Sequence, residues 1–510
     1  MMIRKNLQGE TVEDGDGGGR VLLGFLLGLA AISAALLVRQ TLTPEPVRLL
    51  GFTADRLSAA LALLVAGVGA VTFRFSLRYL DGEPRRSRFL RLLAFTVGSA
   101  YLFMLSTNLL LLFVAWLLTS LGLHELLTFY PDRPEARPPA RKKFLISRLG
   151  DLALIAAIAL IWRDFGTLDL NAVLVAAATD SGGGSGTAIG LLVAVAALTK
   201  SAQFPFHSWL PETMESPTPV SALMHAGIIN AGGALILRFA PLVVRVPEAL
   251  LLLAVVGTLT FVLGTLAMWA QVKVKRTLAW STVSQMGFMM VQCGVAAFPA
   301  ALLHIVGHGC YKAWSFLRSG GLPAFAGPVA STPPARALTL AAVGTALAVP
   351  ALALASRATG FSPLDSPGEL ALTAVVALSV GQVWVALLGG RMLGRSDAAR
   401  KLVGAVAATI GVPVSALALY RGTQAFLAPV VGELPHPDGP LSWAAAVIPV
   451  AALAGLAVLH GMLPTLGRSG AGRVFYVHAL HGFYLGAAAD RVVDGIWRRV
   501  LERTKKVNHG

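Results

Sequence analysis

The sequence predicts an all-α fold, a polytopic bundle of transmembrane helices, on the basis of its composition and the spacing of its apolar segments. Of the 510 residues, 55% are hydrophobic and 13% are charged, and the mean hydropathy is +0.70. Soluble domains carry about 25% charged residues. Apolar runs close to the ~20 residues that span hydrocarbon recur along almost the whole chain. We therefore expect the bilayer, rather than one central core, to organise the fold.

Three regions follow from the distribution of apolar residues. We expect a polar cytoplasmic N-terminus at residues 1–20, a transmembrane domain at 21–463 and a basic cytoplasmic tail at 464–510. The first apolar segment begins too late for a signal peptide, so we expect it to remain as an uncleaved span. The tail mixes aromatic residues with arginines, which favours an amphipathic helix on the cytoplasmic leaflet or against a partner. About 14 spans are expected, near residues 21–38, 57–79, 89–106, 108–129, 144–162, 187–206, 218–239, 247–271, 277–298, 300–318, 337–356, 369–390, 401–420 and 442–463.

Basic residues collect in every second predicted loop, as the positive-inside rule requires of cytoplasmic loops. Arg39 and Arg48, in the first connection, go against this pattern. An even number of crossings places both termini on the same side, which the basic loops assign to the cytoplasm. We expect the membrane to be the bacterial inner (plasma) membrane. This orientation explains the formal net charge of +16, and no nucleic-acid partner is predicted. The clusters are Arg74, Arg78, Arg85, Arg86, Arg88 and Arg91; Arg137, Arg141, Lys142 and Lys143; Lys273, Lys275 and Arg276; Arg391, Arg395, Arg400 and Lys401; and Arg498, Arg499, Lys505 and Lys506.

Three titratable side chains repeat at helical spacing within the tenth predicted span. His304, His308 and Lys312 stand at i, i+4 and i+8, which stacks them on one face of a helix. Ionisable groups inside spans are costly and usually line a pathway. Histidine titrates near physiological pH, and a desolvated lysine can also release its proton. The row predicts a proton or cation pathway; the alternative is two packing histidines and a lysine that snorkels at the span end.

Four prolines interrupt the segment that follows Lys200, and no continuous helix could hold them. Unwound backbone at membrane depth occurs only inside protein or beside a hydrated cavity. We therefore expect Lys200 to sit next to such a gap, with His225 in the next span. A lysine that snorkels to the interface is the alternative.

Further charged residues lie in the fourth and fifth predicted spans. Glu125 is a candidate pathway carboxylate and His124 a candidate relay; alternatively, Glu125 lies at the interface and balances Lys142 and Lys143. Arg148 and Asp151, at i and i+3, form either a supporting ion pair or part of the relay. The sequence contains no phosphate-binding loop, no dinucleotide-binding glycine motif and no zinc-ligand spacing, so we expect no cofactor and no metal on this chain.

Three long motifs, KSAQFPFHSWLP from Lys200, KRTLAWSTVSQMGFM from Lys275 and HIVGHGCYKAWSF from His304, resemble the antiporter-like subunits of respiratory complex I and of multisubunit cation/proton antiporters. The resemblance extends over roughly residues 50 to 320. It implies antiporter-like inverted repeats with broken helices, and a central hydrophilic axis with half-channels on either side. Carried over by position, the axis contains Lys200, His225, His304, His308 and Lys312, and the family's RxxD pair is Arg148 and Asp151.

Where the sequence differs from the complex I subunits, it resembles one branch of this family, the DabB membrane subunits of inorganic-carbon transporters. Leu117 follows Trp116 where complex I subunits usually have glutamate, and His124 and Glu125 come two turns later. Between Pro350 and Glu369, where the family's second broken helix normally holds a lysine, the only charged residues are Arg357 and Asp365. The motif LHELLTFY from Leu123 also resembles this branch, and no long lateral helix is expected after the last span.

This resemblance implies a transporter subunit rather than an enzyme. The expected partner is a soluble zinc protein similar to beta-carbonic anhydrases, DabA, which hydrates carbon dioxide to bicarbonate, and two such heterodimers could associate. Cation flow through this chain would make the hydration effectively one-way. Two alternatives remain open: a proton-translocating subunit of a complex I-type or multisubunit antiporter assembly, and a non-conducting membrane anchor for the partner.

Overall fold

The computed structural model describes residues 15–508 apart from 44, 131, 179–183, 322–331, 391–394 and 433. Most of the predicted polar N-terminus, residues 1–20, lies outside this set, and the first helix already begins at Gly15. Helices dominate the described chain, which confirms the all-α prediction. Its one sheet is a short antiparallel hairpin of β1 (Val47–Leu49) and β2 (Phe52–Ala54), with Val47 opposite Ala54.

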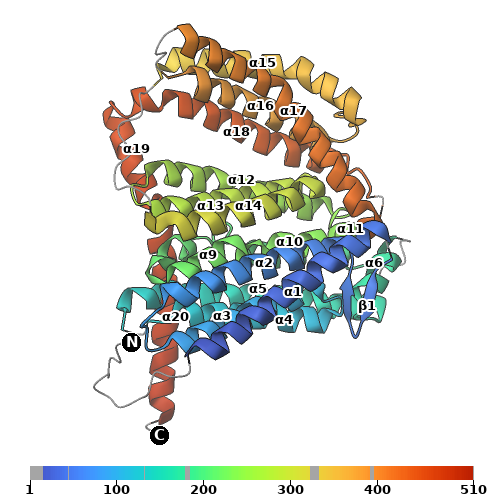
Figure 1. Ribbon diagram of the computed structural model, residues 1–510, viewed down its shortest axis with the longest axis vertical. Helices are drawn as coiled ribbons and strands as arrows, with labels where there is room; N and C mark the ends of the chain where they lie inside the picture. The colour runs from blue at the N-terminus through green and yellow to red at the C-terminus, as the bar shows by residue number, and fades with distance from the viewer. Residues whose placement is uncertain are drawn as a thin grey trace.

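The larger part of the bundle runs from α1 to α14, and the smaller part from α15 to α18, followed by two tail helices (Figure 1). The first part comprises α1 (Gly15–Leu42), α2 (Arg56–Tyr79), α3 (Arg86–Leu105), α4 (Leu109–Leu127), α5 (Arg137–Phe165), α6 (Leu170–Ala178), α7 (Gly186–Lys200), α8 (Trp209–Glu212), α9 (Thr218–Ala226), α10 (Ala231–Arg238), α11 (Ala240–Val243), α12 (Pro247–Ala270), α13 (Val274–Gly294) and α14 (Phe298–Arg318). The remainder comprises α15 (Pro334–Thr359), α16 (Pro367–Leu388), α17 (Arg395–Val431), α18 (Pro440–Leu466), α19 (Gly470–Leu480) and α20 (Leu485–Asn508). Short 3-10 turns are η1 (Pro134–Ala136), η2 (Thr213–Glu215), η3 (Ile228–Asn230), η4 (Ser319–Gly321) and η5 (Gly482–Tyr484).

Eleven helical stretches within the described residues are long and apolar enough to cross a membrane. Three more helices, α7, α13 and α14, lie where spans were predicted near 187–206, 277–298 and 300–318. α7 has only 15 residues, whereas α13 and α14 have 21 residues each and are more polar. Together these stretches account for the number of crossings that the sequence predicts, and the chain is a polytopic membrane protein.

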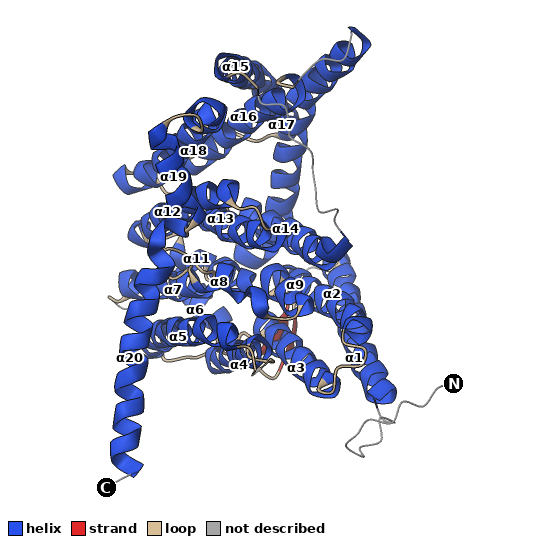
Figure 2. Cartoon of the chain, turned by 90° about the vertical axis from the view of Figure 1, so that its left-hand side faces the viewer, coloured by secondary structure: helices blue, strands red, loops and turns tan. Residues whose placement is uncertain are grey.

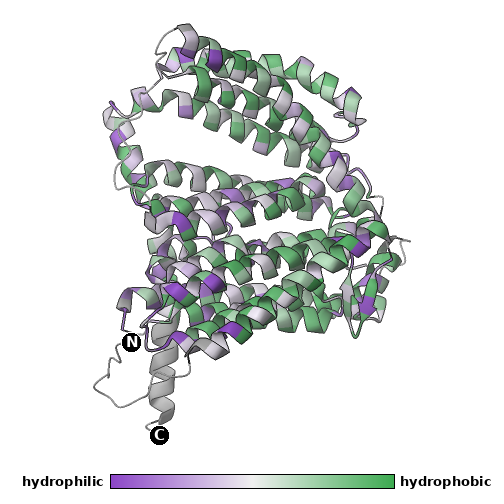
Figure 3. Ribbon diagram, in the orientation of Figure 1, coloured by the Kyte–Doolittle hydropathy of each residue, from purple (hydrophilic) through white to green (hydrophobic). Residues whose placement is uncertain are grey.

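The helices run side by side, so that their ends form two opposite faces (Figure 1). We call one of them the basic face, because it carries the helix ends and turns with Arg85, Arg141, Lys273 and Arg468; it lies on the left in Figure 1. Hydrophilic residues gather there, while green, apolar residues cover most of the helix lengths (Figure 3). The β1–β2 hairpin lies on the opposite face.

The two parts of the bundle have separate hydrophobic cores. The larger core is built by the helices from α1 to α14, and the smaller one mainly by α15, α16 and α17. The 37-residue helix α17 enters both: Leu417 and Tyr420 belong to the smaller core, and Leu427 to the larger one. α17 therefore joins the two parts.

The expected break after Lys200 is present. α7 ends at Lys200, residues 201–208 are turns without regular helix, and α8 restarts at Trp209. In the second part, α15 passes through Pro350 without interruption and ends at Thr359, and α16 is continuous from Pro367. The region Pro350 to Glu369, where a second break was expected, thus contains one stretch without regular helix, residues 360–366 between α15 and α16.

α7 is held against α5 by an unusually close approach. A Cβ atom added at Gly150 would lie 2.2 Å from the Thr199 hydroxyl oxygen, so only glycine fits there. Thr199 directly precedes Lys200. The contact therefore fixes the end of α7, and with it the position of the lysine, relative to α5.

The tail helix α20 lies across the helix ends of the basic face (Figures 1 and 2). Its first turns contact α5. Gly486 allows this approach, because an added Cβ atom would lie 2.6 Å from the Glu212 carboxylate. Where its side chains are described, the predicted amphipathic tail thus docks on its own chain.

Candidate functional site

Lys200 points into the protein core and not toward the membrane surface. Its ammonium nitrogen Nζ donates to the Trp116 carbonyl oxygen at 3.0 Å and lies 4.0 Å from the centroid of the Trp116 ring. A carbonyl dipole and an aromatic face both attract a cation. The alternative of a snorkelling lysine is therefore wrong for Lys200.

Trp116 connects Lys200 to the Arg148–Asp151 pair. The indole Nε1 of Trp116 donates to Asp151 Oδ1 at 2.8 Å, and Arg148 Nη2 lies 2.7 Å from Asp151 Oδ2. Asp151 is buried, whereas the Arg148 side chain is 32% exposed. The predicted pair is thus formed, and its carboxylate also binds the side chain against which Lys200 rests.

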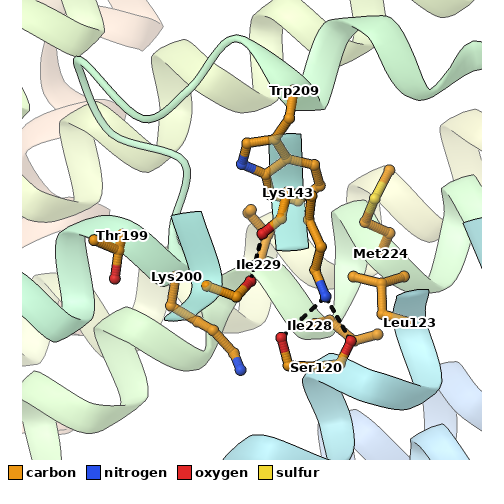
Figure 4. A pocket seen from close by; sticks show the side chains of 10 residues that line it. Ser120, Leu123, Lys143, Thr199, Lys200, Trp209, Met224, Ile228 and Ile229 are labelled. Atoms are coloured by element: carbon orange, nitrogen blue, oxygen red, sulfur yellow. Dashed lines mark hydrogen bonds between the residues drawn. The ribbon is translucent and has the colours of Figure 1, made fainter. Parts of the chain in front are cut away.

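A second lysine, which was predicted to lie in a basic loop, shares a cavity with Lys200. Lys143 is buried on α5. Its Nζ donates to the Ser120 carbonyl oxygen at 2.5 Å and to the Ser120 hydroxyl oxygen at 2.9 Å. Figure 4 shows the Lys143 and Lys200 side chains on the walls of one cavity of about 10 Å³, beside Ser120 and Thr199. Such a volume holds about one water molecule. The spacing of Lys143, Ser147 and Asp151 at i, i+4 and i+8 is the signal that could have identified Lys143.

The adjacent Lys142 is fully buried and faces the tail. Its Nζ lies 2.8 Å from Glu212 Oε2 and 2.7 Å from Asp490 Oδ1, and it donates to the Gly486 carbonyl oxygen at 3.4 Å. Burial raises the pKa of Glu212, and the positive charge of Lys142 opposes that rise. Lys142 therefore ties α5, α8 and α20 together at the basic face.

α9 separates the Lys200 cavity from α14. Met224 lines that cavity, while the next residue, His225, is stacked on Phe316 of α14 with ring centroids 4.4 Å apart. His225 is fully buried, and neither of its ring nitrogens has a hydrogen-bond partner. The structure thus brings His225 between Lys200 and the predicted histidine row.

The row on α14 is formed as the spacing predicts. The rings of His304 and His308 have centroids 5.7 Å apart, and His304 Nδ1 lies 2.9 Å from Gln292 Oε1. Lys312 is fully buried, and its Nζ donates to the Leu278 carbonyl at 3.0 Å and to the Ser281 hydroxyl, both on α13. The alternative of a snorkelling lysine is wrong here too.

His207 was not selected from the sequence, although it lies within the KSAQFPFHSWLP motif. It is buried in the break between α7 and α8, with its ring centroid 5.8 Å from that of Trp280. Both ring nitrogens are buried without a hydrogen-bond partner. It therefore joins the set of titratable groups inside the first core.

Glu125 lies apart from this set, whereas His124 lies at its edge, close enough to Lys143 for the two groups to interact electrostatically. Glu125 is on the surface, where its Oε2 pairs with Arg88 Nη2 at 2.9 Å, and the two side chains are 47% and 54% exposed. The alternative in which Glu125 balances Lys142 and Lys143 is wrong, because both lysines are buried and have the partners given above. His124 packs on Phe144 with ring centroids 5.4 Å apart. The structure does not bring either residue to Lys200.

No group of three or more histidine, cysteine, aspartate or glutamate side chains suited to a metal ion occurs within the described ranges. The described set is instead a series of single titratable groups in the protein interior. Three lysines and four histidines reach the inside of the first core, although each is costly in an apolar medium. Such groups can exchange protons with water molecules in small cavities.

Comparisons with known proteins show which family this chain resembles. Residues 106–329 match the family model described as "NADH:quinone oxidoreductase/Mrp antiporter, TM", and residues 49–90 match "NADH-Ubiquinone oxidoreductase (complex I), chain 5 N-terminus". Among solved structures, the chain is similar to one in the "Structure of Mrp complex from Dietzia sp. DQ12-45-1b", with a TM-score of 0.54 and 25% identity; the match covers 96% of this chain and 60% of that one.

Two curated relatives are named as carbon transporter subunits. "Probable inorganic carbon transporter subunit DabB2" of Halothiobacillus neapolitanus is 34% identical over 96% of this chain and 88% of its own length. "Probable inorganic carbon transporter subunit DabB" of Hydrogenovibrio crunogenus is 42% identical over 52% of each chain. The chain thus spans about half the length of the second relative. These names agree with the prediction of a transport subunit rather than an enzyme. The chain therefore belongs to the DabB branch of the antiporter-like membrane subunits found in complex I and Mrp complexes.

Proposed function

We propose that this chain conducts a cation, with the proton as first choice over sodium, as the membrane subunit of a complex that accumulates inorganic carbon. The observation that carries the proposal is the placement of Lys143, Lys200, His225, His308 and Lys312 inside the first core. Burying ionisable side chains in the membrane interior costs free energy, and side chains that are kept there usually line an ion or proton pathway. The ion would pass between the Lys200 cavity and the α14 row by way of α9.

The proposed partner is a DabA-like zinc protein similar to beta-carbonic anhydrases, which would hydrate carbon dioxide to bicarbonate in the cytoplasm. The proposed location is the bacterial inner membrane, with the basic face and both termini in the cytoplasm. The partner would then dock on the basic face, where α20 lies. We further propose that two such heterodimers can associate. Zinc chemistry belongs to the partner in this proposal, and proton movement belongs to this chain.

The test is growth in ambient air of a host that lacks carbonic anhydrase and expresses this chain with its neighbour-encoded partner. Lys200→Ala and His308→Ala should abolish rescue, because each removes one group from the proposed pathway. Arg48→Ala, which removes an exposed arginine of strand β1, is the matched control and should rescue like wild type. Co-purification of the partner with each variant checks that assembly is intact. Rescue by both pathway variants at wild-type level would refute conduction through these residues.

The two alternatives separate in further measurements. A passive anchor keeps accumulating bicarbonate after an uncoupler collapses the ion gradient, whereas a conducting subunit stops. An antiporter or redox-complex subunit would co-purify with quinone-binding, iron-sulfur or other antiporter subunits instead of a zinc protein. The name of the relative that matches 96% of this chain favours the carbon-transport assignment over the antiporter or redox-complex alternative.

A further inference from the structure

A wide cavity opens on the face opposite the basic face, between the two parts of the bundle. Its volume is about 550 Å³, many times the ~10–15 Å³ that a cavity needs to hold one water molecule by the same measure. Its walls are the end of α13, the start of α14, the start of α16 and the end of α17 with the following loop. Both cores therefore contribute to one large cavity that lies away from the docked tail.

One carboxylate, Glu369, lines this cavity. It occupies the first turn of α16, and its Oε2 atom is buried without a hydrogen-bond partner. Gly368 holds this turn against the end of α13, because an added Cβ atom would lie 2.0 Å from the Val295 carbonyl oxygen. Glu369 is thereby fixed beside the residues that lead into α14.

The other charged and titratable groups around Glu369 come from three elements. Asp365 lies in the loop before α16, Arg421 and Tyr420 on α17, and His436 in the loop after α17. Arg421 Nη1 donates to Gln424 Oε1 at 2.7 Å, and the Asp365 carboxylate accepts from Ser362 at 2.6 Å. Both nearby charges thus have hydrogen-bond partners of their own, whereas one Glu369 oxygen does not.

The helix that begins at the cavity wall also carries the histidine row. Phe298, on the wall, begins the helix that carries His304 six residues later, about 9 Å along the axis. Gln292 lies three residues before Val295 of the wall. Gln292 Oε1 accepts from His304 Nδ1–H, so the lone pair of the neutral ring is on Nε2. That Nε2 atom is buried and has no hydrogen-bond partner, and it is the atom on which a proton can be received.

We propose that this cavity is the proton vestibule of the face opposite the basic face, and that the Glu369 carboxylate takes up the proton and delivers it to His304. In the first step, Glu369 Oε2 accepts a proton from a hydronium ion in the cavity, which leaves water. In the second step, the carboxylic acid gives its proton to water, and a water chain that extends from the cavity along α14 carries the proton to His304 Nε2, which becomes protonated. The inference rests on the proposed function, since it names the group that feeds the same pathway.

A proton fits this site better than a metal cation does. A hard metal ion needs several oxygen ligands that converge on one point, and no acidic or histidine cluster of three or more occurs in the described part of the chain. A single carboxylate with one unpartnered oxygen is sufficient for a proton.

The competing explanation is that Glu369 only caps α16. Ser366 and Glu369 have the spacing of a capping box, and the Ser366 hydroxyl accepts from the Glu369 backbone N–H at 3.1 Å. Two substitutions separate capping from proton uptake. Glu369→Gln keeps an oxygen acceptor of the same size but cannot titrate. Ser366→Ala removes the cap and leaves the carboxylate.

The experiment measures proton flux into proteoliposomes that contain the complex of this chain with its partner, using a trapped pH dye and an imposed gradient. Glu369→Gln should lower flux by about tenfold to a hundredfold, Glu369→Asp should retain part of it, and Ser366→Ala should match wild type while melting at a lower temperature. Wild-type flux in Glu369→Gln, or an equal loss of flux in Ser366→Ala, would contradict proton uptake by Glu369 but would not contradict conduction through the proposed pathway. Absence of flux in wild type, or flux that requires sodium and disappears in choline, overturns both.

Discussion

Lys142 and Lys143 are neighbours in the sequence, yet their ammonium groups bind on different sides of α5. Lys142 pairs with Asp490 of α20 and Glu212 of α8, while Lys143 binds Ser120 beside Lys200. Successive helix residues are about 100° apart, so one short stretch of α5 reaches both the docked tail and the core cavity. Paired substitutions can therefore test the two roles independently.

Lys142→Met should release the tail helix. The change leaves Glu212 and Asp490 facing each other without a cation, and breaking a buried pair destabilises the contact. Because both carboxylates are partly exposed, we expect about 1–2 kcal/mol, or roughly tenfold faster trypsin cleavage after the exposed Arg491. Unchanged cleavage would show that α20 is held by other contacts.

Lys143→Met should leave the tail docked and impair conduction. Methionine fills a similar apolar volume, so the fold should persist, but the cavity loses one of its two ammonium groups. We expect flux in proteoliposomes to fall by about tenfold or more, as in Lys200→Ala, with Arg491 cleavage unchanged. Full flux with intact assembly would remove Lys143 from the pathway.

Acidification should tighten the contact between α20 and Glu212. Burial raises the pKa of Glu212, and the docked α20 contributes to that rise because Gly486 covers the carboxylate and Asp490 adds a like charge beside it. The docked state therefore binds a proton more tightly than the undocked state. Linkage then makes docking stronger as pH falls from neutral toward the range where Glu212 titrates. The distance between a spin label at Ala488→Cys and a second spin label on α5, in a Cys310→Ala background, reports this change. Glu212→Gln should show the acidic distances at neutral pH; the same pH response in that variant would assign it to another group.

Gly150→Ala should destabilise the protein through its contact with α7. The new methyl group would overlap the Thr199 hydroxyl, and such overpacking typically costs about 1–3 kcal/mol. Thermal unfolding in detergent should show a lower Tm, and adding Thr199→Ala should restore part of it, as a double-mutant cycle detects. Gly67→Ala on α2 is the control, because nothing lies within 4 Å of its added Cβ atom. An unchanged Tm in Gly150→Ala would show that α5 and α7 can move apart freely.

The features that could be predicted from the sequence depend on neighbouring residues. His304, His308 and Lys312 share a face because helix periodicity is local, and the break after Lys200 follows from its prolines. Lys143 was misplaced because the run from Arg137 to Lys143 has the composition of a basic loop, although α5 already begins at Arg137 with prolines in its first turn. Prolines are tolerated there, since the first helical N–H groups have no intrahelical acceptor.

The features that could not be predicted depend on contacts between distant segments. The partner of Glu125 is Arg88 of α3, which only the packing of α3 on α4 brings near. Glu369 stands at a helix start, where its spacing from Ser366 indicates a cap. Its position beside a cavity arises because α13, α14 and α17 meet α16 there, and the sequence of α16 alone contains no sign of it.

The length of α17 has a consequence for how lipids act on this protein. Its 37 residues extend over about 55 Å, whereas the hydrocarbon layer is ~30 Å thick. The helix therefore crosses obliquely, with Pro413 and Pro429 as points where it can bend. Because its residues are packed into both cores, a thinner or thicker bilayer changes its tilt and so shifts one part of the bundle against the other. The length of the lipid acyl chains should therefore change how the two parts of the bundle meet around the cavity that Glu369 lines.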